Sequence, residues 1–199
     1  MLGTRLGTWL RWLRGTATFV FIAALCLAVA VLVIAFIPGS PVTQQLPAAG
    51  LTGLERVGGV TAGVVVDPSG WIPFTTHDPS PAQRLLYLLT VLPGLVLIAE
   101  IARRMANLLR GAQASDPFTA TTARALATVG KLTAFAGLGA WILSQVAQAV
   151  LSATMLTSPV TFHPHQSPLW WLAVGLIFAA FGQIIDRGVT MRAELDTVI

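Results

Sequence analysis

The sequence predicts an all-α membrane protein, a four-transmembrane-helix bundle with a small extracytoplasmic β-hairpin. Of its 199 residues, 55% are hydrophobic and only 10% are charged, whereas soluble domains carry roughly 25% charged residues. Apolar segments long enough to cross the roughly 30 Å hydrocarbon layer recur along the chain. The predicted spans are residues 16–37, 84–102, 128–156 and 169–186.

Backbone chemistry and charge give these segments a conformation and an orientation. Each segment must be helical in lipid, because unpaired backbone groups are costly there, and Pro93 in the second segment is expected to kink it. If both termini are cytoplasmic, every Lys and Arg except Arg56 and Arg84 lies on the cytoplasmic side. An even number of crossings also places both termini on the same side of the membrane, so the two signals agree.

The N-terminal residues 1–15 leave two interpretations open. Their arginines and helically spaced leucines fit an amphipathic helix on the inner leaflet, and they also fit a continuation of the first membrane helix. A cleaved signal peptide is a further alternative, although the apolar stretch is longer than the usual 7–15 residues. The single cysteine, Cys26, excludes an intrachain disulfide and is expected to be a buried, unreactive thiol.

The longer outer connection, residues 38–83, is predicted to hold the hairpin. It begins with a Pro- and Gln-rich linker and continues with a Val-rich run, an Asp67-Pro68-Ser69-Gly70 turn and a second run at Trp71–Phe74. The hairpin either caps the helix ends or binds an external ligand, and another copy of the chain is a further packing partner. A shorter outer connection covers residues 157–168.

The inner connection, residues 103–127, carries signals for the start of a helix. Ser115 or Asp116 can cap a helix whose first turn contains Pro117, and Thr119 is another candidate cap. The third helix is therefore expected to begin before it enters lipid.

Charged residues flank the inner ends of the spans. Glu100 is expected to pair with Arg103 or Arg104 at helical spacing, or with Lys131 of the next helix. Residues 187–199 are predicted to continue the last helix as a cytoplasmic tail.

Two short motifs carry a resemblance to a known family. One is Asp116-Pro117-Phe118-Thr119, followed by Arg124 and Gly130. The other runs from the last apolar segment into Asp186-Arg187-Gly188 and then into Arg192-Ala193-Glu194-Leu195-Asp196-Thr197-Val198. In order and spacing, and with the outer Val-Asp-x-x-Gly segment, they resemble the bacterial membrane family called domain of unknown function 2975. The resemblance covers nearly the whole chain, but Glu194–Val198 is compressed relative to the family's usual tail.

The resemblance implies a multi-pass protein of the bacterial inner (cytoplasmic) membrane without an assigned activity. Family members are often encoded beside a small helix-turn-helix regulator, so the resemblance implies such a regulator as a cytoplasmic partner. Motif-like and charged residues gather on the inner side of the chain. The candidate interaction residues are Pro117, Phe118, Thr119, Arg124 and Arg192.

No catalytic or cofactor-binding pattern is present in the sequence. It holds no phosphate-binding Gly loop, no Ser/His/Asp set and no zinc-protease motif, so we expect neither an enzyme nor a cofactor. The basic residues form short clusters rather than a stripe interleaved with aromatics, which argues against direct nucleic-acid binding. His163 and His165 are weak candidates for a metal site, with His77 or Asp78 as further ligands, and solvated loop histidines are the ordinary interpretation.

The third span carries a stripe of small and polar residues. Small side chains allow close helix packing, and amides can hydrogen-bond across helices. The stripe is either a packing seam or part of a polar path shared with the fourth span. Its members are Ala136, Ala140, Ser144, Gln145 and Gln148, with Gln183 on the fourth span.

Two functional hypotheses follow from these features. The first is a membrane protein that acts by interaction through its cytoplasmic loop and tail. A second copy of the chain is one of the partners that this hypothesis allows. The alternative is a small transporter or an immunity-type membrane protein that uses the glutamine stripe. The lack of an ionisable residue in the middle of a predicted span counts against coupled transport.

Overall fold

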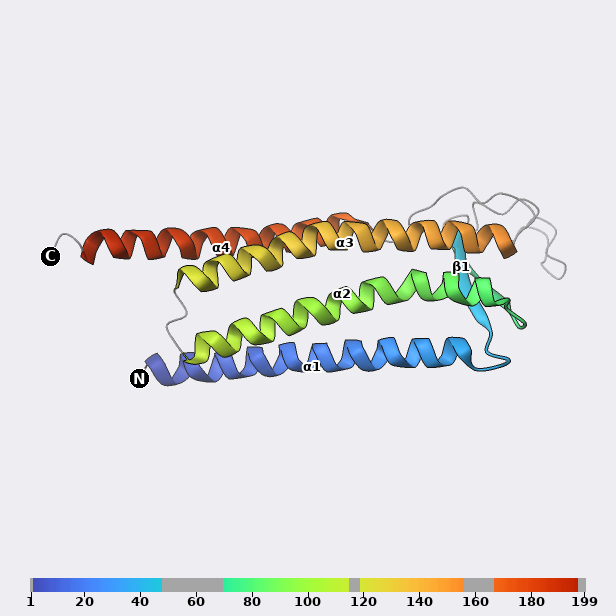
Figure 1. The fold of residues 1–199 in the computed structure, drawn as a ribbon, viewed down its shortest axis with the longest axis horizontal. Coiled ribbons are helices and arrows are strands. Elements are labelled where there is room, and N and C mark those ends of the chain that lie inside the picture. Colours follow the sequence, from blue (N-terminus) through green and yellow to red (C-terminus); the bar gives the residue numbers. More distant parts are fainter. Residues whose placement is uncertain (1, 48–69, 115–118, 156–166, 197–199) are drawn as a thin grey trace, which may run out of the picture. The chain divides into compact units, whose positions relative to one another are not determined.

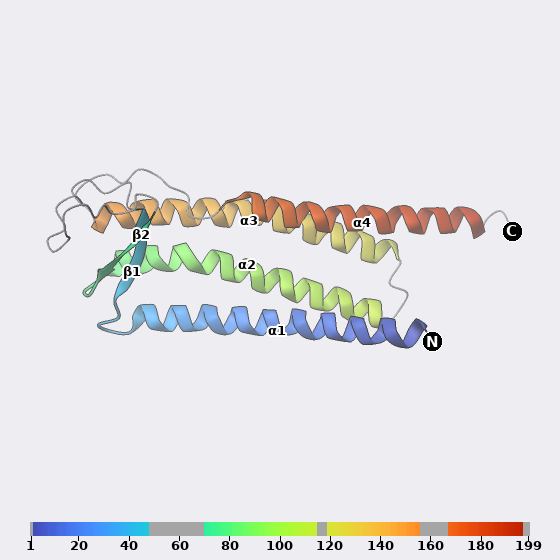
Figure 2. The ribbon, with the colours of Figure 1, turned by 180° about the vertical axis from the view of Figure 1, so that it is seen from behind.

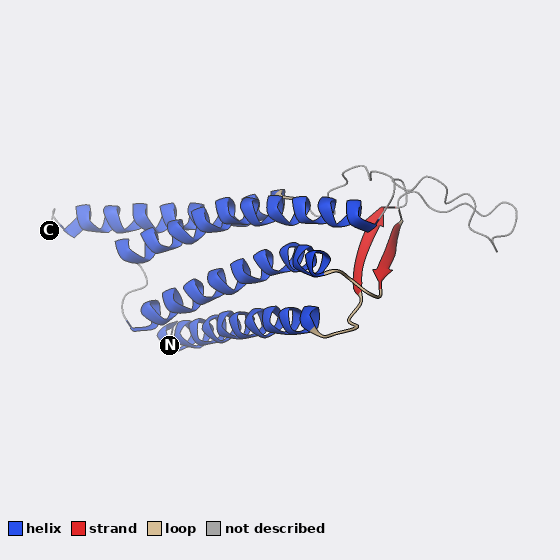
Figure 3. Cartoon of the chain, turned by 45° about the vertical axis from the view of Figure 1, so that its right-hand side comes forward, coloured by secondary structure: helices blue, strands red, loops and turns tan. Residues whose placement is uncertain are grey.

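The computed structural model describes residues 2–47, 70–114, 119–155 and 167–196. Figure 1 follows the chain through them, Figure 2 shows the ribbon from behind, and Figure 3 separates helices from strands. The elements in chain order are α1 (Leu2–Phe36), β1 (Val42–Pro47), β2 (Trp71–Thr76), α2 (Pro81–Ala114), α3 (Ala120–Met155) and α4 (Leu169–Asp196).

Each of the four helices is long and apolar enough to cross a membrane. The candidate spans are Thr8–Phe36, Pro81–Gln113, Ala120–Met155 and Leu169–Arg192. In each span, only 11% to 22% of the most apolar 18-residue stretch is buried inside the protein. Because so much apolar surface is left uncovered, this fold requires a bilayer as its solvent. The predicted fold class, an all-α protein with four membrane-spanning helices and a small antiparallel sheet, is confirmed.

Reciprocal hydrogen bonds explain where α2 begins. The Gln83 N–H donates to Ser80 Oγ at 3.3 Å, and the Ser80 N–H donates to Gln83 Oε1 at 2.9 Å. This capping box satisfies two of the donors that a helix start leaves unpaired. Pro81 takes the first helical position, where its missing N–H removes no helical hydrogen bond. The helix continues through Pro93, and the expected kink there stays a prediction.

The helices extend beyond the predicted spans at the ends that carry most arginines. α2 continues to Ala114 and α3 begins at Ala120, so most of the predicted connection 103–127 is helical. α4 likewise runs to Asp196, through much of the predicted tail. Alanine, leucine and arginine have high helix propensity, and charged side chains allow a helix to continue into water.

The N-terminal segment is part of one continuous helix. α1 runs from Leu2 to Phe36, which agrees with the interpretation that residues 1–15 continue the first membrane helix. The expectation of a buried Cys26 is wrong, because its side chain is exposed on α1. Ala24, two residues earlier, is buried. Positions two apart on a helix point in nearly opposite directions, so Cys26 faces away from the protein.

The sheet contains one predicted strand and one unpredicted partner. β1 and β2 are antiparallel, with Val42 opposite Thr76 and Pro47 opposite Trp71. β2 contains the predicted run at Trp71–Phe74, but its partner comes from the segment that was interpreted as a linker. That part of the hairpin prediction is wrong; the Val-rich run lies outside the described residues.

Alternating burial explains why the linker-like segment forms a strand. Val42 and Gln44 are buried, whereas Thr43 is exposed, and Thr43 Oγ1 lies 3.1 Å from Thr75 Oγ1 across the pair. The buried Gln44 amide donates from Nε2 to the backbone oxygen of Gln148 at 3.1 Å. A polar residue on the inner face of a strand hides the hydrophobic alternation from sequence analysis.

The helices belong to two compact units. Unit 1 comprises Met1–Val29, Pro93–Ile142 and Ser167–Ile199, and unit 2 comprises Ala30–Leu92 and Leu143–Gln166. In unit 2, Arg84 Nη1 donates to the backbone oxygens of Ala35 and Ile37, at 2.9 and 3.1 Å. The Ala35 carbonyl lies in the last turn of α1, where the helix itself offers no donor. The Ile37 carbonyl follows the helix and also accepts from the Ser40 N–H at 3.2 Å. Arg84, an exception to the charge asymmetry, therefore has a structural role.

Small residues bring α3 and α4 into backbone contact within unit 1. A Cβ added at Gly130 would lie 2.6 Å from the Gly175 oxygen and 2.7 Å from the Ala179 nitrogen. Further along, the same kind of close approach places Gly182 against the backbone of Ala123. Within lipid such contacts replace the burial of large side chains as the source of helix association.

We predict that Gly130→Ala destabilises the α3–α4 pair. The added methyl group must displace backbone atoms, and overpacking of this kind costs about 1–3 kcal/mol. The matched control is Gly139→Ala on the same helix, because a Cβ there meets no atom within 4 Å. Reversible unfolding in detergent, followed by circular dichroism, measures both variants. Equal midpoints would contradict the close approach at Gly130.

Candidate functional site

A cleft lined by both apolar and polar groups lies between the second half of α2 and the first turns of α3, inside unit 1. Its volume is about 730 Å³, which is within the range of roughly 300–1,000 Å³ typical of ligand sites. One guanidinium, one carboxamide and four hydroxyls line it beside three apolar side chains. We call it the Arg104 cleft. Its residues are Arg104, Asn107, Leu108, Gly111, Thr119, Thr121, Thr122, Ala125, Thr128 and Val129.

The threonines are held by the start of α3. The Thr122 N–H donates to Thr119 Oγ1 at 3.2 Å, and the two hydroxyl oxygens lie 2.9 Å apart. Thr119 is therefore the N-cap of α3, as one of the predicted alternatives states. Thr128 Oγ1 donates to the Arg124 backbone oxygen at 2.8 Å. The hydroxyl oxygens of Thr122 and Thr128 can each accept a further hydrogen bond.

One carboxylate between two guanidinium groups fixes the charge of the cleft. Arg104 Nε donates to Glu100 Oε1 at 2.6 Å, and Arg103 donates to both Glu100 oxygens at 2.8 and 2.9 Å. The predicted pairing of Glu100 thus takes place with both arginines. Two cations share one anion, so the group keeps a net positive charge. A guanidinium has five N–H donors, and Arg104 has donors left for an acceptor in the cleft.

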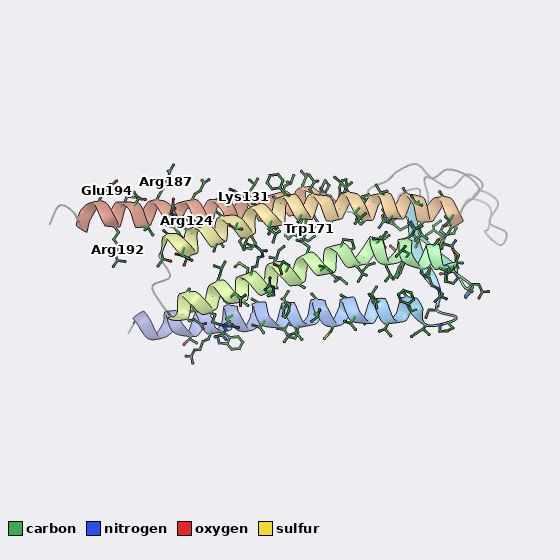
Figure 4. The ribbon with its side chains drawn as sticks, viewed as in Figure 1. Arg124, Lys131, Trp171, Arg187, Arg192 and Glu194 are labelled. Carbon is green, nitrogen blue, oxygen red and sulfur yellow. The ribbon has the colours of Figure 1, made fainter. Side chains whose placement is uncertain are left out.

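The structure brings only part of the predicted interaction set to this cleft. Thr119 lines it. Arg124 is exposed on α3 and contributes its carbonyl to Thr128, and Arg192 is exposed on α4; Figure 4 labels both. Pro117 and Phe118 lie outside the described residues.

Sequence analysis missed the polar residues on the α2 side. Arg104, Asn107 and Gly111 line the cleft at spacings of three and four, which places them on one helix face. This signal was hidden because residues 103–127 were interpreted as a connection. If the second helix had been predicted to continue past Gly111, these three residues would have fallen on one helix face.

A second, smaller cavity of about 170 Å³ lies in unit 2, between the sheet and the helices. Gln44, which is only 9% exposed, has no hydrogen-bond partner for its Oε1 among the described residues. Its Nε2 donates a hydrogen bond to the Gln148 carbonyl. No charged side chain lines this cavity; its residues are Thr43, Gln44, Gln45, Tyr87, Thr90, Gln148 and Leu151.

A family model described as "protein of unknown function (DUF2975)" matches residues 71–199. The chain belongs to this family. The matched region contains β2, the helices α2, α3 and α4, and every residue of the Arg104 cleft. No curated protein and no solved structure matches the chain.

In this DUF2975 protein, Gln145 and Gln148 belong to unit 2, and Gln183 belongs to unit 1. Gln145 is buried, and Gln148 is half-buried. Gln183 is exposed on α4 beside Gly182, which packs on Ala127. A shared polar path through the three glutamines stays a prediction.

Close contacts between α3 and α4 in unit 1 involve small residues. The residues of α3 that lie against the α4 glycines or face Trp171 (labelled in Figure 4) are Ala123, Ala127, Gly130, Ala134 and Gly137. Ala136, Ala140 and Ser144 of the predicted stripe are half-buried, and their role as a packing seam stays a prediction.

The metal hypothesis rests on residues that the structure describes only in part. His163 and His165 lie outside the described residues, and His77 and Asp78 are exposed after β2. Among the described residues of this DUF2975 protein, no three His, Cys, Asp or Glu side chains are grouped to hold a metal ion.

Thr119→Ala is predicted to weaken the first turn of α3 and so to widen the Arg104 cleft. Loss of an N-cap hydroxyl costs about 1 kcal/mol. Hydrogen exchange of the Thr122 amide in detergent should accelerate by about fivefold. The control, Thr190→Ala, removes an exposed hydroxyl that donates to the Asp186 carbonyl within α4. An unchanged rate at Thr122 would show that Thr119 does not cap the helix.

Proposed function

We propose that this chain is a bacterial inner-membrane protein that binds an acidic segment of a cytoplasmic protein in the Arg104 cleft. The observation that carries the proposal is the cleft itself: a space large enough for a ligand and lined in part by polar groups, next to a carboxylate that two arginines share. In this account the protein has both termini in the cytoplasm and passes or receives a signal at that face.

The charge distribution supports the orientation. Apart from Arg56, whose structure is not described, and Arg84, every Lys and Arg belongs to unit 1, which contains the cleft. Figure 4 labels four of them on α3 and α4: Arg124, Lys131, Arg187 and Arg192. Positive charge accumulates in cytoplasmic segments of membrane proteins.

The chemistry of the cleft supports a protein segment as the ligand. Leu108, Ala125 and Val129 offer apolar contact, while Asn107 and the threonines can pair with a peptide backbone. Excess positive charge around Arg104 favours an acidic side chain and speeds encounter at low salt. The small helix-turn-helix regulator that the family resemblance implies is the partner to test first.

No specific observation favours the transporter or immunity-type alternative. That function would draw Gln145, Gln148 and Gln183 into one polar path; Gln145 is buried, whereas Gln183 is exposed on α4. The interaction proposal instead uses the residues that line the Arg104 cleft within unit 1.

Filling the cleft is expected to abolish partner binding. Thr128→Trp places an indole in the cleft, whereas Thr190→Trp places one on an exposed part of α4; both threonines donate to the carbonyl four residues earlier. In a bacterial two-hybrid assay with the full chain and a helix-turn-helix regulator encoded beside its gene, the first variant should lose the reporter signal, as expected for a loss of at least about tenfold in affinity, or 1.4 kcal/mol.

Helix content in detergent confirms that both variants fold. The control should retain the wild-type signal. The proposal fails if wild type and regulator do not associate, or if both variants bind equally.

A further inference from the structure

The small cavity of unit 2 contains a buried amide that is only half used. Gln44 of β1 is 9% exposed, and its Nε2 donates to the Gln148 carbonyl of α3 at 3.1 Å. Its Oε1 is buried and has no hydrogen-bond partner among the described residues. A buried acceptor without a partner is costly, because it has given up its hydrogen bonds to water. This atom is therefore a candidate ligand contact.

The space beside this amide is large enough for a small molecule. We call it the Gln44 cavity. Its volume is about 170 Å³, and an apolar cavity of about 150 Å³ can hold benzene. All residues that line it belong to unit 2, so it is independent of the Arg104 cleft in unit 1. The last torsion of a glutamine side chain is broad, so the Gln44 amide can turn toward a donor in this space.

Two of the polar groups at the Gln44 cavity can offer a ligand only acceptors. Thr90 Oγ1 donates its proton to the Tyr87 backbone oxygen at 2.6 Å, so this hydroxyl keeps its acceptor lone pairs alone. Gln44 Oε1 is a carbonyl oxygen and has no proton to donate. A ligand that satisfies both groups must therefore present N–H or O–H donors.

The rest of the lining favours an uncharged ligand with an apolar part. No described residue at the cavity carries a charge, and an ion without a counter-charge is costly to bury. Leu151, which is fully buried, and Tyr87, which is half-buried, offer apolar contact. Apolar walls with a few placed polar groups are typical of small-molecule sites.

We propose that the Gln44 cavity binds a small uncharged molecule that carries N–H or O–H donors, such as a primary amide. One donor pairs with Gln44 Oε1 and a second with Thr90 Oγ1, while the apolar part of the molecule lies against Leu151. The hydrogen bond from Gln44 Nε2 to the Gln148 carbonyl stays in place. The ligand thus supplies the partner that the buried amide lacks.

Tyr87 provides a local probe, because it is the only tyrosine in the sequence and it lines the cavity. The full chain with 3-fluorotyrosine at this position, in detergent, gives one fluorine NMR signal that can be followed during titration. Acetamide and acetone are nearly equal in size and shape, but only acetamide carries N–H donors. Acetamide should shift the signal saturably in the millimolar range. Acetone should bind at least about fivefold more weakly, the worth of one hydrogen bond.

Substitutions separate the role of the amide from that of the cavity volume. Gln44→Met keeps the length of the side chain but removes Oε1, so acetamide should lose its advantage over acetone. Thr90→Phe fills the cavity and should abolish the saturable shift with both probes. Leu92→Phe, at another half-buried position of α2 that does not line the cavity, should leave binding unchanged. Helix content by circular dichroism confirms that each variant folds.

Four results would overturn the proposal. Equal affinity of the wild type for acetamide and acetone would show that no acceptor contacts the ligand. Tighter binding of acetamidinium, a cation of the same shape, would show that the site selects charge. Equal binding by Thr90→Phe and Leu92→Phe would place the ligand elsewhere. Shifts that stay linear in probe concentration would mean that the cavity holds only water.

Discussion

Contact between apolar helix surfaces and acyl chains is the interaction on which this structure depends. Most of α1 is uncovered by protein: only 11% of its most apolar stretch is buried, although that stretch has a mean hydropathy of 3.2. The largest fully buried side chains are Leu151, Val129 and Thr133, which would be a very small core for a soluble chain of this length. Lipid therefore supplies the apolar environment that a protein core supplies elsewhere.

This dependence decides how the helices recognise one another. Because acyl chains are as apolar as leucine, burial of large side chains gives no preference for helix over lipid. The glycines at 130 and 175 instead allow backbone contact between α3 and α4. Polar side chains add directional hydrogen bonds to these contacts. Gln83 Nε2 donates to Thr154 Oγ1 at 3.3 Å, and the Gln44 amide donates to the Gln148 carbonyl.

The bilayer requirement also explains which features the sequence could predict. Four spans were predictable because hydropathy reports the preference for lipid directly, and the N-cap at Thr119 was predictable because its signal is local. β1 was not, because its inward Gln44 interrupts the apolar alternation. The α2 side of the Arg104 cleft was missed for a related reason. Charged residues such as Arg103 mark the end of a hydrophobic run but not the end of a helix.

The Arg104 cleft reflects the same division of roles. It combines hydroxyls with a guanidinium whose carboxylate partner is shared, which suits an acidic segment that arrives from water. Arginine fits this place, because the guanidinium binds oxyanions through several donors while its stem packs on apolar surface.

Cys26 offers the most direct measurement of the central claim, because it is exposed near the middle of α1 and is the only cysteine in the sequence. A nitroxide attached to it in proteoliposomes reports collisions with oxygen, which concentrates in acyl chains, and with a water-soluble nickel chelate. Frequent collisions with oxygen and few with nickel are predicted, because acyl chains cover this face. Greater access to nickel, or shielding from both reagents, would contradict the account.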